Sequence, residues 1–367
     1  MKLLVIGVGK SGSRIADQFA QLNKKARIER GVSILTSAYA VSNDRDSLAA
    51  LVSRETDFLY RLLIGSFPQG AEGTATVGEL GMETIQAESD RILSTIRRGE
   101  FFETAAFLVV ASAWGNFGSV LVPIVGQKLK ERYVGKPIYC LLILPAESEE
   151  PPAKRTYNAA VCLKSVNKAA DAVFLVDNEK LKRDGVPLDE TWYQANQEIL
   201  TPFYDLLCAS EVSGSKYAGA RTLGVGDIIR TISGFTAIGK GKVRISLARF
   251  FSKRLPTFRE KGVETLKALE ALNLALSRLS VDCDPRESGR ALYLLSAPSQ
   301  EISIDMAMAL GNRLRELTNT GEIRGGDLSG EQTAIQVIVA LSELTYIEKV
   351  KNYYDKAAAY LREGKGE

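Results

Sequence analysis

The chain begins with Met1-Lys-Leu-Leu-Val-Ile-Gly-Val-Gly-Lys-Ser-Gly-Ser-Arg14, an apolar run that leads into three glycines. Gly7, Gly9 and Gly12 have the spacing G-x-G-x-x-G, and a helix-like stretch follows over residues 13–23. A strand that ends in glycines lets backbone amides approach an anion closely, and the helix behind them directs the positive end of its dipole to the same place. The stretch therefore predicts a phosphate-binding loop. The alternative is a tight strand-to-helix turn that binds nothing.

The glycines alone do not identify the nucleotide. A dinucleotide-binding fold places an acidic residue about 20 residues further on, where it holds the ribose. The next apolar run, residues 32–41, ends in Ser42-Asn-Asp44, so Asp44 comes later than this spacing requires. The segment Arg45-Asp-Ser-Leu48 that follows is typical of a helix start. An NAD(P)-dependent oxidoreductase is therefore the weaker alternative.

Composition bounds the class of protein. A chain of 367 residues is longer than a domain with a single hydrophobic core usually is, so two domains are expected. Hydrophobic residues make up 45% and charged residues 25%, as in a water-soluble globular protein. The net charge of +3 is too small to imply nucleic acid or membrane as a partner. We expect a cytoplasmic protein that binds no nucleic acid, has no membrane contact other than an indirect one, if any, and keeps its four scattered cysteines reduced.

The chain contains no histidine, which removes every mechanism that depends on an imidazole. Ser-His-Asp triads, Cys-His proteases and histidine-ligated zinc are excluded. Phosphoryl transfer fits the residues that remain, because it relies mostly on positioning and on stabilisation of charge.

Short apolar runs alternate with amphipathic stretches through the first half. The expected strands are 3–8, 34–41, 107–112, 138–144 and 172–177, and the expected helices between them are 82–98, 119–133 and 156–170. This pattern is typical of a parallel sheet covered on both faces. Residues 189–208 predict one long helix, interrupted at Pro202. Beyond about residue 220 we expect a second α/β domain, with helices 227–233 and 257–279 and strands 241–247, 291–296 and 335–341.

A second loop of small residues has the same context as the first. The strand 107–111 runs into Ser112-Ala-Trp-Gly-Asn-Phe-Gly-Ser119, and a helical stretch follows. Two such loops at the carboxyl ends of parallel strands would enclose a polyphosphate. Further on, Asn178 ends a strand, and Trp192 and Asn196 are four residues apart on one helix face. That face could stack an aromatic ring on a base and hydrogen-bond its edge.

This order of parts resembles the tubulin/FtsZ superfamily, most closely its archaeal CetZ branch. The resemblance covers nearly the whole chain and is carried by the opening glycine loop and by the segments 64–81, 143–145, 176–178, 192–196 and 226–232. It implies a Rossmann-like parallel-sheet nucleotide domain over 1–188, a long central helix over 189–215, a C-terminal activation domain over 216–357 and a polar tail over 358–367. It also implies a GTPase that polymerises head to tail into protofilaments and acts in cell shape or a related process.

The resemblance assigns roles to individual residues. It places Gly9, Lys10, Ser11, Gly12, Ser13 and Arg14 in the first phosphate loop, and Gly115, Asn116, Phe117 and Gly118 in the second. Asn178 and Asn196 correspond to residues that read guanine, and Trp192 to the aromatic residue that stacks on it. Glu150 is the preferred ribose ligand, and Glu149 is the alternative. The implied ligands are GTP and GDP, with Mg²⁺ bound to the nucleotide.

Two departures from the family pattern concern nucleotide affinity and hydrolysis. The family signature G-G-G-T-G-[ST]-G reads here Trp114-Gly-Asn-Phe-Gly-Ser-Val120, so Asn116 and Phe117 replace small residues. In the loop before the second domain, Asp227 matches the second of two acidic positions, but Gly224 stands at the first. We therefore expect slow, assembly-dependent hydrolysis, completed by Asp227 from the adjacent subunit. The alternatives are that Asp227 serves as a helix N-cap, and that the protein binds guanine nucleotide with little or no hydrolysis.

Overall fold

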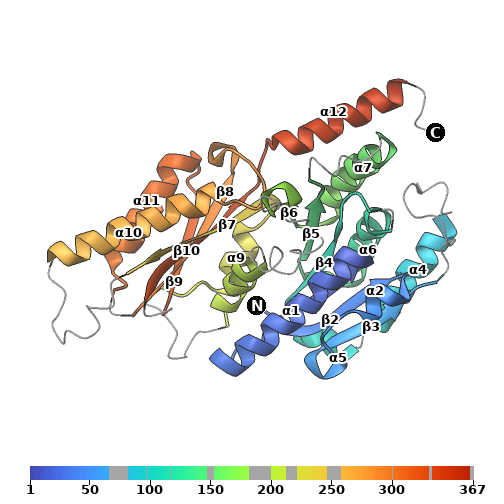
Figure 1. Ribbon diagram of the computed structural model, residues 1–367, viewed down its shortest axis with the longest axis horizontal. Coiled ribbons are helices and arrows are strands. Elements are labelled where there is room, and N and C mark those ends of the chain that lie inside the picture. Colours follow the sequence, from blue (N-terminus) through green and yellow to red (C-terminus); the bar gives the residue numbers. More distant parts are fainter. Residues whose placement is uncertain are drawn as a thin grey trace. The chain divides into compact units, whose positions relative to one another are not determined.

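The computed structural model describes residues 1–65, 82–96, 98–115, 117–146, 153–181, 200–211, 221–245, 258–299, 301–329 and 333–363. The chain divides into two compact units, shown in the ribbon of Figure 1. The first unit comprises Met1–Thr201 and Tyr346–Glu367, and the second comprises Pro202–Thr345. Each unit has its own hydrophobic core.

The sheet of the first unit is parallel throughout, in the strand order β3-β2-β1-β4-β5-β6. Every residue of β1, β5 and β6 is buried, which explains why these segments read as continuous apolar runs rather than alternating ones. The expected strands of the first half are all present. The bounds are β1 Leu3–Val8, β2 Leu35–Ser42, β3 Leu59–Leu63, β4 Ala106–Ser112, β5 Ile138–Leu144 and β6 Ala172–Asp177.

Helices of the first unit fall into two groups of neighbours. Helices α1 and α2 pack together near β1 to β3, and α6 packs on α4 and α7, with α12 on α7. Because the chain runs outward from β1 in both directions, right-handed crossovers place the two groups on opposite faces. The bounds are α1 Gly9–Arg30, α2 Arg45–Ala49, α4 Met82–Thr95, α5 Arg98–Glu103, α6 Gly118–Arg132, α7 Ala153–Ala169 and α12 Glu348–Arg362, with short 3₁₀ turns η1 Glu55–Asp57 and η3 Asn178–Leu181.

The second unit has a mixed sheet in the order β7-β10-β8-β9. Strand β10 pairs antiparallel with β7 and β8, and β8 pairs parallel with β9. Helix α10 lies very close to β7, because a Cβ on Gly241 would come within 1.9 Å of the Ala271 carbonyl oxygen. The bounds are α9 Val225–Thr231, β7 Gly234–Arg244, α10 Phe258–Ser277, η5 Pro285–Glu287, β8 Arg290–Ala297, α11 Ile304–Thr318, β9 Ile323–Ser329 and β10 Ala334–Ser342.

Several segments differ from the sequence expectation. The helix expected over 82–98 ends at Thr95, and the strand expected over 241–247 begins at Gly234 and ends at Arg244. Strands β3 and β9 and helices α11 and α12 carry no expectation from the sequence. The long helix expected over 189–215 is described only at 200–211, where residues 200–209 are helical. The contacts group Tyr346–Glu367 with the first unit rather than with the segment 216–357.

Within the described residues, no helix is both long enough and apolar enough to pass through a bilayer.

Candidate functional site

The first glycine loop lies at the carboxyl end of β1 and packs very tightly. A Cβ on Gly7 would come within 2.0 Å of the Gly12 carbonyl oxygen, and one on Gly12 within 2.3 Å of the Val110 carbonyl oxygen. Gly9 has φ +76°, a conformation that glycine adopts without strain. Val8 precedes α1 and offers no side-chain oxygen to its first amides. The start of α1 therefore packs against β1 and β4, and no side chain of its N-cap residue accepts a hydrogen bond from its first backbone amides.

The second loop meets the first at the same edge of the sheet. A Cβ on Gly118, the first residue of α6, would come within 2.8 Å of the Ala111 side chain and 3.4 Å of the Val8 carbonyl oxygen. The Phe117 ring lies 4.0 Å from the position of a Cβ on Gly9. The strand order reverses between β1 and β4, and ligands of open α/β sheets bind at such a switch point. The starts of α1 and α6 therefore lie together where an anion would bind.

Two serine hydroxyls in the second loop are buried without a partner. Within the described part of the chain, the Oγ atoms of Ser112 and Ser119 are shielded from solvent and make no hydrogen bond. A buried hydroxyl without a partner carries a desolvation cost, and it becomes satisfied when a ligand oxygen accepts its proton. These donors stand beside the uncapped start of α6, so the residues present fit a phosphate group. Ser119 occupies the Ser/Thr position of the family signature. Ser112 was not predicted from the sequence, because it looks like an ordinary strand end.

Side chains around the two loops have varied roles. Lys10 is exposed and Ser11 and Arg14 are half-buried, whereas Ser13 is buried and donates from its hydroxyl to the Val41 carbonyl oxygen at 3.2 Å. Ser13 would therefore contribute to a phosphate site only through its backbone. The Trp114 ring is half-buried, and the Arg155 guanidinium lies 5.5 Å from its centroid.

Asp44 caps the helix α2. Its carboxylate accepts from the backbone amides of Asp46 at 3.0 Å and Ser47 at 3.3 Å, and from the Ser47 hydroxyl. The Ser47 hydroxyl is the main cause that lowers the pKa of Asp44, and the charge of nearby Lys10 adds to it. The helix start expected after Asp44 is confirmed, and this carboxylate is engaged as a cap rather than available for the ribose of a dinucleotide.

The carboxyl ends of β5 and β6 are joined through Lys349 of α12. Its ammonium donates to the Pro145 carbonyl oxygen at 2.6 Å and to the buried carboxylate of Asp177, the last residue of β6. The Asp177 carboxylate also accepts from the Glu179 amide at 2.8 Å. Asn178, the expected guanine reader, follows directly and is half-buried. The sequence missed Lys349, because nothing local distinguishes it from the other lysines of an amphipathic helix.

Asp227 lies in the second unit, on the first turn of α9. Its Oδ2 accepts from the Gly224 amide at 3.1 Å, so Gly224 is the N-cap of α9, and Asp227 is the third residue of the helix and completes a capping box rather than being the N-cap itself. Its Oδ1 lies 3.9 Å from a guanidinium nitrogen of Arg324 on β9, and 36% of its side chain remains exposed. The carboxylate thus takes part in the capping box and is also accessible to solvent. Arg324 was not predicted from the sequence, because it lies in a glycine-rich strand that the sequence pattern does not reveal.

Four further candidates, namely Asn116, Glu150, Trp192 and Asn196, lie outside the described residues, as does Glu149.

Comparison with known proteins adds the family. Residues 2–185 match the model of the Tubulin/FtsZ family, GTPase domain, and residues 185–359 match that of Tubulin-like CetZ, C-terminal domain. The chain is 27% identical over 361 residues to tubulin-like protein CetZ3 of Haloferax volcanii, across 96% of this chain and 90% of that protein. It is also 27% identical over 366 residues to CetZ1 of the same organism, with the same coverage.

Solved structures share the fold. A GTPγS-bound protofilament of CetZ2 from Haloferax volcanii superposes with a TM-score of 0.81 at 23% identity, covering 99% of both chains. The FtsZ dimer of M. jannaschii superposes with a TM-score of 0.66 at 18% identity, covering 94% of this chain and 88% of that one. The matched GTPase domain spans the strands and loops of the first unit that form the candidate site. The chain therefore belongs to the tubulin/FtsZ family.

Proposed function

We propose that this protein binds guanine nucleotide, polymerises head to tail into protofilaments and hydrolyses GTP slowly, acting in the cytoplasm in cell shape or a related process. The observation that carries the proposal is the meeting of the α1 and α6 starts beside the buried, unpartnered hydroxyls of Ser112 and Ser119. Relatives solved as a GTPγS-bound protofilament and as a GDP-bound monomer support the choice of ligand and of assembly.

Phosphates of the nucleotide would lie across the two glycine loops. Backbone amides at Gly9 to Ser13 and at Gly115 to Gly118 would donate to their oxygens, with the hydroxyls of Ser112 and Ser119. The exposed ammonium of Lys10 would supply positive charge beside the first loop. Mg²⁺ would arrive bound to the phosphates, since this ion keeps several waters and binds through few protein ligands.

The base and ribose would lie beyond the second loop. In this proposal Asn178 and Asn196 read the guanine edge, Trp192 stacks on its face and Glu150 accepts from the ribose hydroxyls. Asn178 is supported by its position directly after β6, at the same edge of the sheet as the phosphate loops. Indole stacking and two carboxamides suit a purine and serve no evident purpose around a nicotinamide.

Hydrolysis would be completed by the adjacent subunit. Asp227 is 36% exposed on the first turn of a short helix, so it can orient a water molecule held against another chain. One carboxylate would act where the family uses two, because Gly224 stands at the other position. Groups that position and polarise the reacting water are worth roughly 100-fold or more, which is why we expect slow turnover.

A second candidate is a filament protein that binds GTP and hydrolyses very little of it. The observation that favours it is the engagement of the Asp227 carboxylate by the Gly224 amide and by Arg324. A carboxylate with two partners is a weaker acceptor for a water proton than an unpaired one.

Two measurements test the proposal. Extraction and chromatography of the nucleotide that co-purifies should yield GDP or GTP; a pyridine dinucleotide in its place would overturn the assignment. Phosphate release measured together with sedimentation should begin only above the concentration at which filaments form. Filaments without phosphate release would select the second candidate, and rapid release by dilute monomer would exclude the shared site.

A further inference from the structure

Helix α9 is short, and it carries Asp227 at one end and a network of polar contacts at the other. The helix has seven residues, Val225–Thr231, and a length of about 10 Å. A tilt of roughly 10° about its C-terminal end would therefore move its N-terminal turn by roughly 2 Å. The direction in which the Asp227 carboxylate points thus depends on how the far end of α9 is held.

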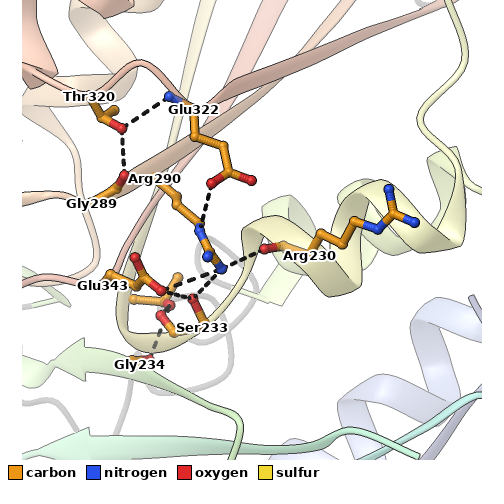
Figure 2. A network of polar contacts seen from close by, with 9 residues as sticks. Arg230, Ser233, Gly234, Gly289, Arg290, Thr320, Glu322 and Glu343 are labelled. Carbon is orange, nitrogen blue, oxygen red and sulfur yellow. Dashed lines mark hydrogen bonds and ion pairs between the residues drawn. The ribbon is translucent and has the colours of Figure 1, made fainter.

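Arg290 holds that end, as Figure 2 shows. Its Nη1 donates to the Arg230 carbonyl oxygen at 2.7 Å and lies 3.3 Å from the Ser233 hydroxyl. Its Nε donates to Glu322 at 2.9 Å, and Nη1 also lies 3.3 Å from Glu343 Oε1. A guanidinium presents its donors in a fixed planar fork, so one side chain joins the last turn of α9 to two carboxylates, one directly before β9 and one directly after β10.

The Glu343 partner is itself held in an unusual conformation. It has φ +52°, which side chains with a Cβ adopt rarely, and it faces Gly234, which has φ +57°. Its amide donates to the Ser233 carbonyl oxygen and its carboxylate accepts from the Ser233 hydroxyl, both at 2.9 Å. A Cβ on Gly289 would come within 2.7 Å of the same carboxylate and 3.0 Å of the Glu343 Cβ, so the two residues pack closely. Such strained conformations persist where the surroundings fix them, and they cluster at functional sites.

The N-terminal end of α9 is contacted by a second arginine. Arg324 lies on β9, which pairs in parallel with β8, the strand that begins with Arg290. Arginines from adjacent strands thus contact both ends of one short helix. The contact at Asp227 is long, at 3.9 Å, whereas the contact at Arg230 is a hydrogen bond of 2.7 Å, so the C-terminal end is held more firmly.

We infer that Arg290 is a positioning residue for GTP hydrolysis, and that its contacts with Arg230, Ser233, Glu322 and Glu343 fix α9 so that Asp227 reaches the nucleotide of the adjacent subunit. The inference rests on the proposed role of Asp227. A misplacement of about 1 Å can cost roughly 100-fold in rate, so loss of this anchor lowers turnover although Arg290 touches neither nucleotide nor water.

The test compares Arg290→Ala with the wild type and with Arg286→Ala, a matched control at an exposed arginine four positions earlier. Turnover per assembled subunit, measured as phosphate release over pelleted protein, should fall roughly 10- to 100-fold in Arg290→Ala and stay unchanged in the control. The affinity of the monomer for GTP should stay unchanged in both variants, because the binding loops lie in the first unit. A fall in GTP affinity equal to the fall in turnover would overturn the positioning role.

A double variant separates this inference from the proposed function. If Arg290 acts only through Asp227, the double variant Arg290→Ala/Asp227→Ala should turn over no more slowly than Asp227→Ala alone. If the double variant instead lost turnover by the product of the two single effects, the inference would be overturned. Unchanged turnover in Asp227→Ala would instead overturn the shared-site mechanism, whatever Arg290 does. If Arg290→Ala does not fold, Arg290→Lys decides the question: a lysine can pair with one carboxylate but lacks the fork, so turnover should still fall with GTP affinity intact, and wild-type turnover would contradict the inference.

Discussion

Lys349 and Asp177 form an ion pair across 172 residues of sequence, and it joins the first turn of α12 to the end of β6. The Asp177 side chain is 8% exposed and that of Lys349 is 20% exposed, so both charges are largely removed from water. The same ammonium donates to Pro145 at the end of β5. Helix α12 is thereby held at the edge of the sheet where Asn178 follows β6.

We predict that Lys349→Met destabilises the first unit, because it leaves the Asp177 carboxylate buried without its cation. Removal of one partner from such a pair costs about 3 kcal/mol, equivalent to a fall in melting temperature of roughly 6 to 12 °C. Lys351→Met is the matched control, since Lys351 is exposed on the same helix and its ammonium lies 5.6 Å from the centroid of the Tyr346 ring. Equal melting temperatures for the two variants would contradict the prediction.

The packing of the first loop leads to a second prediction. Gly12→Ala places a Cβ against the Val110 backbone, which cannot move without shifting β4, so the variant should lose about 1–3 kcal/mol of stability and most of its affinity for GTP. Gly65→Ala should change neither, because no atom of the described residues lies within 4 Å of its added Cβ. Denaturant unfolding and nucleotide titration measure the two effects. Tight GTP binding by Gly12→Ala would argue against this loop as the phosphate site.

Ser119→Ala should change stability and binding in opposite directions. The ligand-free protein should gain about 1 kcal/mol, because a buried hydroxyl without a described partner disappears. GTP affinity should fall by roughly 10-fold, because a hydrogen bond to a charged phosphate oxygen is lost. Ser94→Ala, at an exposed serine of α4, is the control for both measurements. A loss of stability without a loss of affinity would show that this hydroxyl serves the fold alone.

The two roles of Asp227 can be separated by Asp227→Asn. The carboxamide oxygen still accepts from the Gly224 amide, so stability should change by less than about 1 kcal/mol. The charge that orients water is lost, so turnover per assembled subunit should fall roughly 100-fold. Asp284→Asn is the control, since Asp284 caps the short helix η5 in the same unit through the Arg286 amide at 3.0 Å. Equal turnover in both variants would leave Asp227 as a cap only.

The Asp44 cap should make a pH-dependent contribution to stability. The pKa of Asp44 is lowered in the folded protein, mainly by the Ser47 hydroxyl, so its ionised form stabilises the fold above the ordinary pKa of aspartate and this contribution is lost as pH falls through the lowered value. Asp44→Ala should therefore cost about 1 kcal/mol at pH 7 and progressively less below about pH 4. Chemical denaturation at a series of pH values measures the difference, with Asp355→Ala as a control at an exposed aspartate. A difference that does not change with pH would refute the role of the charge.

Strands that the sequence did not reveal share a physical cause. In β3, Arg61 interrupts the apolar run, and its guanidinium donates to the carbonyl oxygens of Leu48, Leu51 and Ser53. In β9, Gly325 leaves room for the Tyr293 ring and Gly326 for Leu223, so the strand lacks the apolar periodicity that would identify it. Both are edge strands. The residue types that suit them depend on contacts with residues distant in the chain, so a local sequence pattern does not predict these strands.

The sequence by itself determined the parallel sheet of the first unit, the two glycine loops and their positions after β1 and β4. Buried strands and strand-to-helix turns can be predicted in this way because their signals lie in consecutive residues. It also determined that a helix starts after Asp44, whereas the helix that carries Asp227 starts two residues earlier than expected, at Val225. Only the tertiary structure decided that Gly118 abuts the end of β1, that Lys349 pairs with Asp177 and that Arg290 holds α9. These contacts join residues that are far apart in the chain, and their energies depend on burial and on the geometry of partners, which local propensity does not specify.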